Sequence, residues 1–277
     1  MRLSVLLSVY LGTEKEELHR CLQSIDAQTH RPNEIVMVLD GPVKPEVDRY
    51  IAEHSISIGV PLRILPFAEN RGLGPALADG LVACQYELVA RVDTDDVSVP
   101  DRFTLQVSEF ESDPDLSVLG GLLEEKYLVG NTSTSLTRPA PLDPASIRRA
   151  AVYRNPLSHP TVMLRRQAVL DTGNYQPMLW FEDYDLWVRL LLAGHRCRNI
   201  DRVLVRADAD RDYFQRRGGI RYLGRELALA RRFRELGFHN PLQSLRFILT
   251  RAGFRLVPSG LRSWLYFRVL RQRSGEA

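Results

Sequence analysis

The sequence predicts an α/β protein with a mostly parallel sheet flanked by helices, followed by a basic helical C-terminal extension. Buried-strand patterns alternate with amphipathic-helix patterns through residues 1–92. Polar or acidic residues follow several of these strands, at the sheet edge where such folds bind ligands. The last segment, residues 211–277, differs from the rest in its charge.

The alternation starts with an apolar strand over residues 3–9. A helix over 16–28 comes next, with its apolar side chains on one face. The elements that follow are predicted at 34–39 (strand), 46–55 (helix), 62–65 (strand), 75–83 (helix) and 86–92 (strand). This alternation implies right-handed crossovers between parallel strands.

The middle of the chain is less regular. It predicts strands over 116–123 and 161–164, a polar loop over 131–144, and a helix that opens near Trp180 and runs through Leu191. Acidic residues in the first turn of that helix suit its dipole, and Asp185 and Arg189 form a favourable i, i+4 pair.

The length and the cysteine content predict a globular protein with reduced thiols. A chain of 277 residues can bury a large core as one large domain or two small ones. No apolar run reaches the roughly 18 residues of a spanning helix, and the apolar start predicts a strand rather than a signal peptide. The three cysteines match no metal or disulfide spacing, which favours reduced thiols and a cytoplasmic location.

Charge is unevenly distributed along the chain. Residues 211–277 hold fifteen Arg and four acidic residues, a net charge of +11, whereas the first 210 residues carry −8. On a helix over 220–236, the projection places Arg221, Arg225 and Arg232 on one face, opposite an apolar face. That basic face is either solvated or docks on an anionic membrane surface, and 261–273 adds interface-type aromatic residues.

Asp93-Thr94-Asp95-Asp96 places three carboxylates within four residues, directly after a buried strand. Clustered carboxylates repel one another unless a cation lies among them, and Mg²⁺ or Mn²⁺ prefers such oxygen ligands. The stretch therefore predicts a metal-assisted nucleotide site. The alternative is a polar strand exit before a helix near Arg102.

Other polar residues converge on the same predicted edge. Tyr10, Asp40 and Asn70 each fall at or shortly after a strand end, as Asp93 does. By themselves, Asp40-Gly41-Pro42 is an ordinary turn and Asn70-Arg71-Gly72 an ordinary loop.

Taken in order, these motifs resemble family 2 glycosyltransferases with a GT-A fold. The resemblance covers roughly residues 2–206. It is carried by Ser8-Val9-Tyr10, Gln28, Glu34-Ile35, Asp40-Gly41, Asn70-Arg71-Gly72, the acidic tetrad, Pro100-Asp101-Arg102 and Glu182-Asp183. The run from Trp180 to Trp187 and the run from Asn155 to Thr161 further resemble the branch that builds bacterial surface polysaccharides and O-antigens.

The resemblance implies inverting transfer of a sugar, UDP- or dTDP-linked, to an acceptor hydroxyl. It implies a metal ligand at Asp95, with Asp96 competing for that role, and Mn²⁺ or Mg²⁺ as the cofactor. The residues expected to bind the nucleotide-sugar are Ser8, Val9, Tyr10, Glu14, Asp40, Asn70, Arg71, Gly72, Asp93 and Thr94.

On the acceptor side, the resemblance implies that Asp183 is the catalytic base, supported by Glu182. The alternative for this pair is dipole compensation at a helix N-terminus. His159 is expected either to be structural or to lie near the diphosphate or acceptor. Trp180 is expected either to stack on a sugar or to be an ordinary core or rim residue.

The expected organisation is a nucleotide-sugar-binding half (1–115), an acceptor-binding half of the same domain (116–210) and the basic extension (211–277). The expected acceptor is a lipid-linked glycan at the inner face of the plasma membrane. One alternative is a sugar-phosphate nucleotidyltransferase, but this sequence has no basic phosphate loop after its first strand. Another is an aspartyl phosphatase, but Val97 stands where the Asp-x-Asp-x-Thr motif requires Thr. The acidic first 210 residues argue against a nucleic-acid partner.

Overall fold

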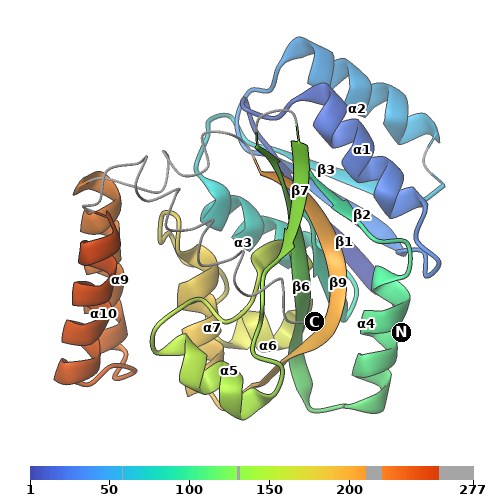
Figure 1. Cartoon of the computed structure of the whole chain (residues 1–277). Coiled ribbons are helices and arrows are strands. Elements are labelled where there is room, and N and C mark those ends of the chain that lie inside the picture. Colours follow the sequence, from blue (N-terminus) through green and yellow to red (C-terminus); the bar gives the residue numbers. More distant parts are fainter. Residues whose placement is uncertain (58, 130–131, 210–219, 256–277) are drawn as a thin grey trace.

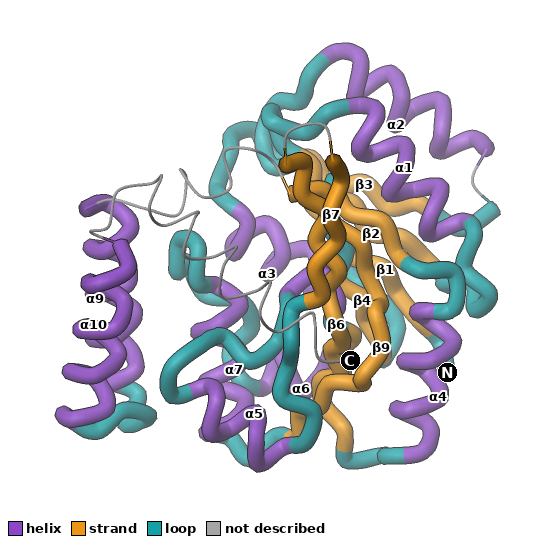
Figure 2. Tube along the Cα trace, in the orientation of Figure 1, coloured by secondary structure: helices purple, strands orange, loops and turns teal. Residues whose placement is uncertain are grey.

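The strands of this chain join into one mixed sheet with helices on both faces (Figure 1). The computed structural model describes residues 1–57, 59–129, 132–209 and 220–255. Within them the strand order is β3-β2-β1-β4-β8-β6-β9-β5, with β7 paired to β6. Figure 2 shows the strands gathered between the layers of helices.

The first half has the predicted alternation, with bounds shifted by a few residues. Its elements are β1 (Leu3–Val9), α1 (Lys15–Asp26), β2 (Glu34–Leu39), α2 (Pro45–Ser57), β3 (Leu62–Pro66), α3 (Leu73–Ala83) and β4 (Leu88–Arg91). All four strands run parallel, with β1 between β2 and β4. Their carboxyl ends therefore lie along one edge of the sheet, as expected for crossover connections.

The second half adds antiparallel strands. It comprises β5 (Asp96–Ser98), α4 (Arg102–Ser112), β6 (Leu116–Val129), β7 (Thr132–Thr137), α5 (Pro144–Ala151), a 3₁₀ turn (His159–Thr161), β8 (Met163–Arg165), α6 (Arg166–Asp171), α7 (Glu182–Leu192) and β9 (Arg196–Ala209). Strand β8 pairs antiparallel to β4 and to β6, which joins the two halves into one sheet.

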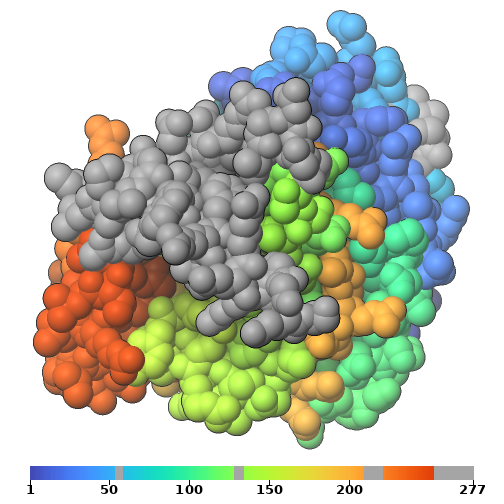
Figure 3. Space-filling model, in the orientation of Figure 1, coloured from blue at the N-terminus to red at the C-terminus, as the bar shows by residue number. Residues whose placement is uncertain are grey.

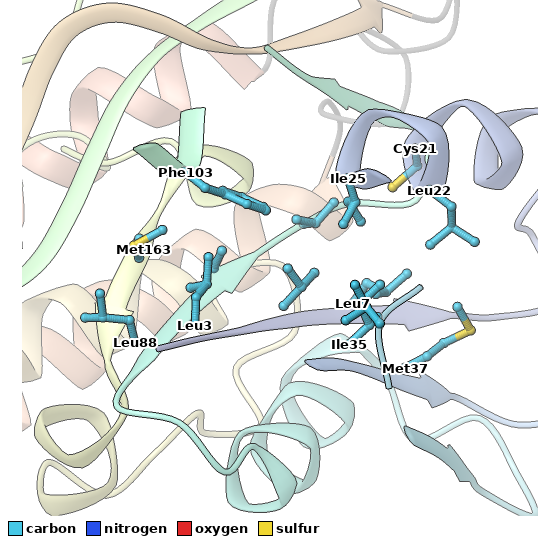
Figure 4. Close-up of a cluster of buried hydrophobic side chains, with 14 of the residues drawn as sticks. Leu3, Leu7, Cys21, Leu22, Ile25, Ile35, Met37, Leu88, Phe103 and Met163 are labelled. Carbon is cyan, nitrogen blue, oxygen red and sulfur yellow. The ribbon is translucent and has the colours of Figure 1, made fainter. Parts of the chain in front are cut away.

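The core forms two layers because alternate side chains of the strands point to opposite faces. Leu3 and Leu7 of β1 pack with α1 and with Phe103 of α4 on one face, as Figure 4 shows. Leu6, on the opposite face of β1, packs in a layer that includes α3, α6 and α7. Burial at both faces explains the near-continuous apolar sequence of β1 and β2.

Two C-terminal helices, α9 (Ile220–Glu235) and α10 (Pro241–Arg255), pack against α7. Tyr184 of α7 lies 5.0 Å, between ring centroids, from Phe233 of α9 and 6.4 Å from Phe247 of α10. A buried aromatic cluster thus fixes the two helices to the rest of the molecule. In Figure 3, α9 and α10, coloured orange to red, adjoin the yellow-green part of the chain.

Two predictions about local structure were wrong. The stretch 131–144 is not all loop, because 132–137 forms β7 and pairs with β6 from Glu124 to Val129. Its Thr- and Ser-rich sequence lacks apolar alternation, so the strand depends on its partner. The second error concerns α9. Arg225 contacts Trp180 and Arg232 contacts Asp185 of α7, so they do not form an outward basic face with Arg221.

No helix among the described residues is long and apolar enough to cross a membrane. The aromatic segment predicted over 261–273 lies outside the described residues.

Candidate active site

A cavity of about 990 Å³ opens at the carboxyl-end edge of the sheet. Segments distant in the sequence line it: the loop after β1, the acidic tetrad, residues 138–141, residues 154–160, the N-terminus of α7 and the C-terminal helices. Of the predicted site residues, the lining includes Tyr10, Glu14, Asp93, Asp95, Asp96, His159, Trp180, Glu182 and Asp183. The structure therefore brings the acidic tetrad and the predicted catalytic pair into one space.

The tetrad contributes a cluster of three carboxylates. One oxygen each from Asp93, Asp95 and Asp96 lies within 4.8 Å of the others. Burial in the cavity wall and the charge of Asp93 raise the pKa of Asp95 to about 6, although its side chain still reaches solvent. The same causes raise the pKa of Asp96 well above its usual value. The cluster is thus electrostatically costly by itself.

Two buried arginines hold this cluster in place. Arg91, at the end of β4, forms an ion pair with Asp93. Burial alone would lower the pKa of Arg91, but the charge of Asp93 raises it. Arg102, which is fully buried, donates hydrogen bonds to the carbonyl oxygens of Arg91 (2.8 Å) and Val162 (3.2 Å) and to Ser98 Oγ (3.0 Å).

The carboxylate cluster suits a divalent cation. Its donors are hard oxygens, which Mg²⁺ and Mn²⁺ prefer, and a cation would relieve the repulsion that raises the pKa values of Asp95 and Asp96. Asp95 and Asp96 would hold the ion, while Asp93 is already engaged by Arg91.

The other predicted nucleotide residues do not line the cavity. Ser8, Val9 and Thr94 are not in its lining, nor are Asp40, Asn70, Arg71 and Gly72. The buried Asp40 carboxylate accepts hydrogen bonds from the backbone N–H groups of Arg71 (2.7 Å) and Gly72 (3.0 Å). Gly41, at φ 84°, lets this loop approach, since a Cβ there would lie 2.6 Å from Asn70 N. Asp40 thus fixes the loop, and its contact with a base or ribose stays a prediction.

The N-terminus of α7 supplies the second carboxylate group of the cavity. Asp183 Oδ2 accepts a 2.6 Å hydrogen bond from Asn155 Nδ2, and its Oδ1 accepts one from Tyr184 N at 2.7 Å. These two hydrogen bonds fix the orientation of the Asp183 carboxylate at the first turn of α7. Beside it, burial and the Asp183 charge raise the pKa of Glu182 to about 7.

Support for α7 comes from the C-terminal helices. The fully buried Asp185 accepts hydrogen bonds from Arg189 Nε (2.7 Å) and from Arg232 Nε (3.0 Å) of α9. The predicted pair of Asp185 and Arg189 is confirmed. The contact with α9 was not predicted, because 47 residues separate its partners.

His159 is buried at the cavity wall and hydrogen-bonds to Tyr175 Oη at 3.0 Å. Burial, and secondarily the charge of Arg91, lower its pKa well below the usual value. The hydrogen bond to Tyr175 accounts for the buried position of His159, and its contact with a diphosphate or acceptor stays a prediction.

Trp180 stands at the cavity rim with an unusual backbone. Its φ is 74°, a conformation that bulky residues rarely adopt. Its ring stacks on Tyr222 of α9 with centroids 5.1 Å apart, and the Arg225 guanidinium lies 3.7 Å from its ring centroid. Contacts from α9 thus hold the ring, which remains 44% exposed.

Several lining residues had no predicted role: Arg91, Arg138, Arg154, Asn155, Tyr222 and Arg251. The sequence could have indicated a role for Arg91, because a charged residue inside an apolar strand needs a buried partner. The others come together only through the tertiary fold.

Comparison with known proteins identifies the family of this chain. The family model for Glycosyl transferase family 2 matches residues 4–173. The amylovoran biosynthesis glycosyltransferase AmsE of Erwinia amylovora is 35% identical over 95% of this chain and 97% of its own length. The UDP-Gal:alpha-D-GlcNAc-diphosphoundecaprenol beta-1,3-galactosyltransferase of Escherichia coli is 29% identical over 98% of this chain and 97% of its own.

Among solved structures, the mannosyltransferase PcManGT of Pyrobaculum calidifontis, in complex with GDP-Man and Mn²⁺, superimposes with a TM-score of 0.63. The superposition covers 100% of this chain and 76% of that one, at 16% identity, and supports the GT-A fold. Together with the family match, these relatives show that the chain belongs to glycosyl transferase family 2, with homologues in bacterial surface-polysaccharide and O-antigen biosynthesis.

Proposed function

We propose that this glycosyltransferase moves a hexose from a UDP- or dTDP-sugar to a hydroxyl of a lipid-linked glycan, with inversion and with help from Mn²⁺ or Mg²⁺. The observation that carries the proposal is the shared cavity, where the Asp93–Asp95–Asp96 cluster and Asp183 approach one space from different elements. Sugar transfer needs these two functions together: a place for the donor diphosphate and a base for the acceptor.

In this proposal the acceptor hydroxyl lies at Asp183. The hydroxyl oxygen attacks the anomeric carbon from the face opposite the diphosphate, and the bond from that carbon to the diphosphate oxygen breaks with its electron pair. The hydroxyl proton passes to Asp183, which Asn155 and Tyr184 N hold in position. Single displacement inverts the anomeric centre, in the same way as a base opposite the leaving group does in glycoside hydrolysis.

On the donor side, Asp95 and Asp96 would hold the divalent cation, and when bound it would supply positive charge to the departing diphosphate. Arg91 keeps Asp93 in place beneath them. Tyr10 and Glu14 line the cavity after β1 and are proposed to contact the nucleotide. The name of the E. coli relative supports a UDP-sugar donor and a diphosphoundecaprenol-linked acceptor.

A lipid-linked acceptor implies work at a membrane surface, and the exposed face of α10 supports this. Leu242, Leu245 and Leu249 are 73%, 53% and 61% exposed, and they share one face at spacings of three and four residues. Arg246 borders this stripe in a segment whose net charge is +11. We propose that the α10 stripe docks on an anionic bilayer, where basic and apolar side chains bind together.

The donor site is tested by calorimetric binding of UDP, dTDP and GDP, with and without Mn²⁺. Wild-type protein should bind one uridine or thymidine nucleotide more tightly with Mn²⁺, and Asp95→Ala should lose that enhancement. Asp115→Ala, which removes an exposed carboxylate outside the cavity lining, is the matched control. Folded wild-type protein that binds none of the three nucleotides would refute the proposal.

A further inference from the structure

The arginines that line the cavity differ in their partners. Three of the four form an ion pair with a carboxylate: Arg91 with Asp93, Arg138 with Glu125 and Arg251 with Glu226. The fourth, Arg154, forms no ion pair with any residue that the structure describes. It is exposed, so its guanidinium is available to a ligand.

Arg154 is unusual because the cavity is rich in negative charge. The carboxylates in its lining are Glu14, Glu17, Asp93, Asp95, Asp96, Glu125, Glu182, Asp183 and Asp208. Arg91 and Arg138 each pair with one of these carboxylates, and Arg251 pairs with Glu226, which lies outside the lining. A planar guanidinium without a partner matches the paired oxygens of a phosphate, to which it can donate two parallel hydrogen bonds.

The position of Arg154 indicates which phosphate it would bind. Its neighbour Asn155 donates to Asp183, so Arg154 belongs to the wall that carries the catalytic base. On its other side, Tyr153 contacts α10: its carbonyl oxygen accepts from Arg251, and Arg246 lies 5.0 Å from its ring centroid. Along the chain, Arg154 therefore stands between the residue that contacts the proposed base and the residue that contacts the helix with the exposed leucine stripe, and it lines the same cavity.

This order matches the order of groups in one kind of acceptor. In a lipid-diphosphate-linked sugar, the diphosphate stands between the sugar that carries the reacting hydroxyl and the lipid chain. The donor diphosphate is expected elsewhere, at the Asp95 and Asp96 carboxylates with their cation. We infer that Arg154 forms an anion subsite for the acceptor diphosphate, an inference that rests on the proposed function.

The inference is tested with two acceptor probes that share a sugar: α-D-GlcNAc diphosphate esterified to a short alkyl chain, and the neutral alkyl α-D-GlcNAc glycoside. Their binding is measured by calorimetry with UDP and Mn²⁺ present. Wild-type protein should bind the diphosphate probe more tightly. Arg154→Gln should lose roughly ten- to hundredfold of that affinity and leave the glycoside unchanged, since hydrogen bonds to charged groups have this strength.

Two further variants make the test specific. Arg154→Lys should retain part of the preference, because it keeps the charge but not the planar fork. Arg149→Gln makes the same charge change at an exposed position of α5 outside the cavity and should behave as wild type.

Equal affinity of wild-type protein for both probes, or an unchanged preference in Arg154→Gln, would overturn the subsite. So would failure of both probes to bind while UDP still binds. Failure to bind any nucleotide would instead remove the proposed function itself, so the two failures are distinguishable.

Discussion

The two carboxylate groups of the cavity are built in different ways. Asp93, Asp95 and Asp96 lie within four consecutive residues, and the buried Arg91 and Arg102 hold them from neighbouring elements. Asp183 depends on parts that are far apart in sequence: Asn155 touches it, and α9 and α10 pack on its helix. A short motif can thus specify the proposed donor side, whereas the proposed acceptor side requires the completed fold.

The sharpest test of this contrast is Asp183→Asn. Loss of the proposed base should lower kcat by about 10²–10⁴-fold, the usual contribution of a general base, while nucleotide affinity changes little. Transfer is measured at saturating donor, with calorimetry of UDP binding alongside. An equal loss of nucleotide binding would place Asp183 on the donor side and break the comparison. Asp115→Asn serves as the control.

The second test addresses α10, which we assign to the acceptor side. Replacing Leu242, Leu245 and Leu249 by Asn should reduce co-sedimentation with anionic phosphatidylglycerol vesicles by at least about tenfold, because each leucine loses apolar burial. The three side chains are exposed, so folding should be unaffected. This triple variant is preferable to deleting 211–277, which would uncover Tyr184 and Val188 of α7. Unchanged sedimentation would contradict membrane docking by this face.

The third test asks whether α9 supports the base. In Arg232→Gln, the buried Asp185 keeps its hydrogen bond from Arg189 but loses the one from α9. We expect the free energy of unfolding to fall by about 2–3 kcal/mol. Transfer should slow while UDP affinity stays constant. Arg231→Gln, one residue away and paired with Glu235 at the surface, should cost less than about 1 kcal/mol. Equal effects of the two variants would show that α9 does not support α7 in this way.

The smallest expected effect is a pH dependence of stability from Glu182. Its pKa of about 7 in the folded protein exceeds the ordinary value of 4.5, so the folded state binds the proton more tightly. Stability is therefore lost as pH rises from about 4.5 to about 7. Glu182→Gln cannot titrate, so relative to wild type it should gain at least about 1 kcal/mol between pH 5 and pH 8.

Thermal unfolding in EDTA at both pH values measures this gain. The exposed Glu16→Gln should leave the difference between the two pH values as in wild type. A gain of the same size at pH 5 and pH 8 would show that Glu182 does not titrate in this range.

The contrast also explains what the sequence could predict. Period-two and helical patterns identified the strands and helices of the first half because both faces of that sheet are buried. Strand β7 was missed because its Ser- and Thr-rich residues form a strand only beside β6. The tetrad was found because its residues are contiguous, although Asp96 proved to be the first residue of β5.

For the proposed acceptor side, no contiguous motif or periodic pattern was available, and only the family resemblance pointed to it. Arg225 and Arg232 were predicted to face outward, since a helical projection cannot show which neighbour lies beside the buried face. Long arginine side chains there reach Trp180, just before α7, and Asp185 within it. The roles of Arg154 and Asn155 depend on the path of their loop past Asp183, which no local pattern encodes.

The bond from Arg232 to Asp185 has a consequence for synthesis of the chain. Domains emerge from the ribosome N-terminal part first. The carboxylate triad and the strands that carry it are therefore present before α9 exists. Helix α7, by contrast, receives its last support only when α9 and α10 have emerged, so a nascent chain acquires its carboxylate triad first and the complete surroundings of Asp183 afterwards.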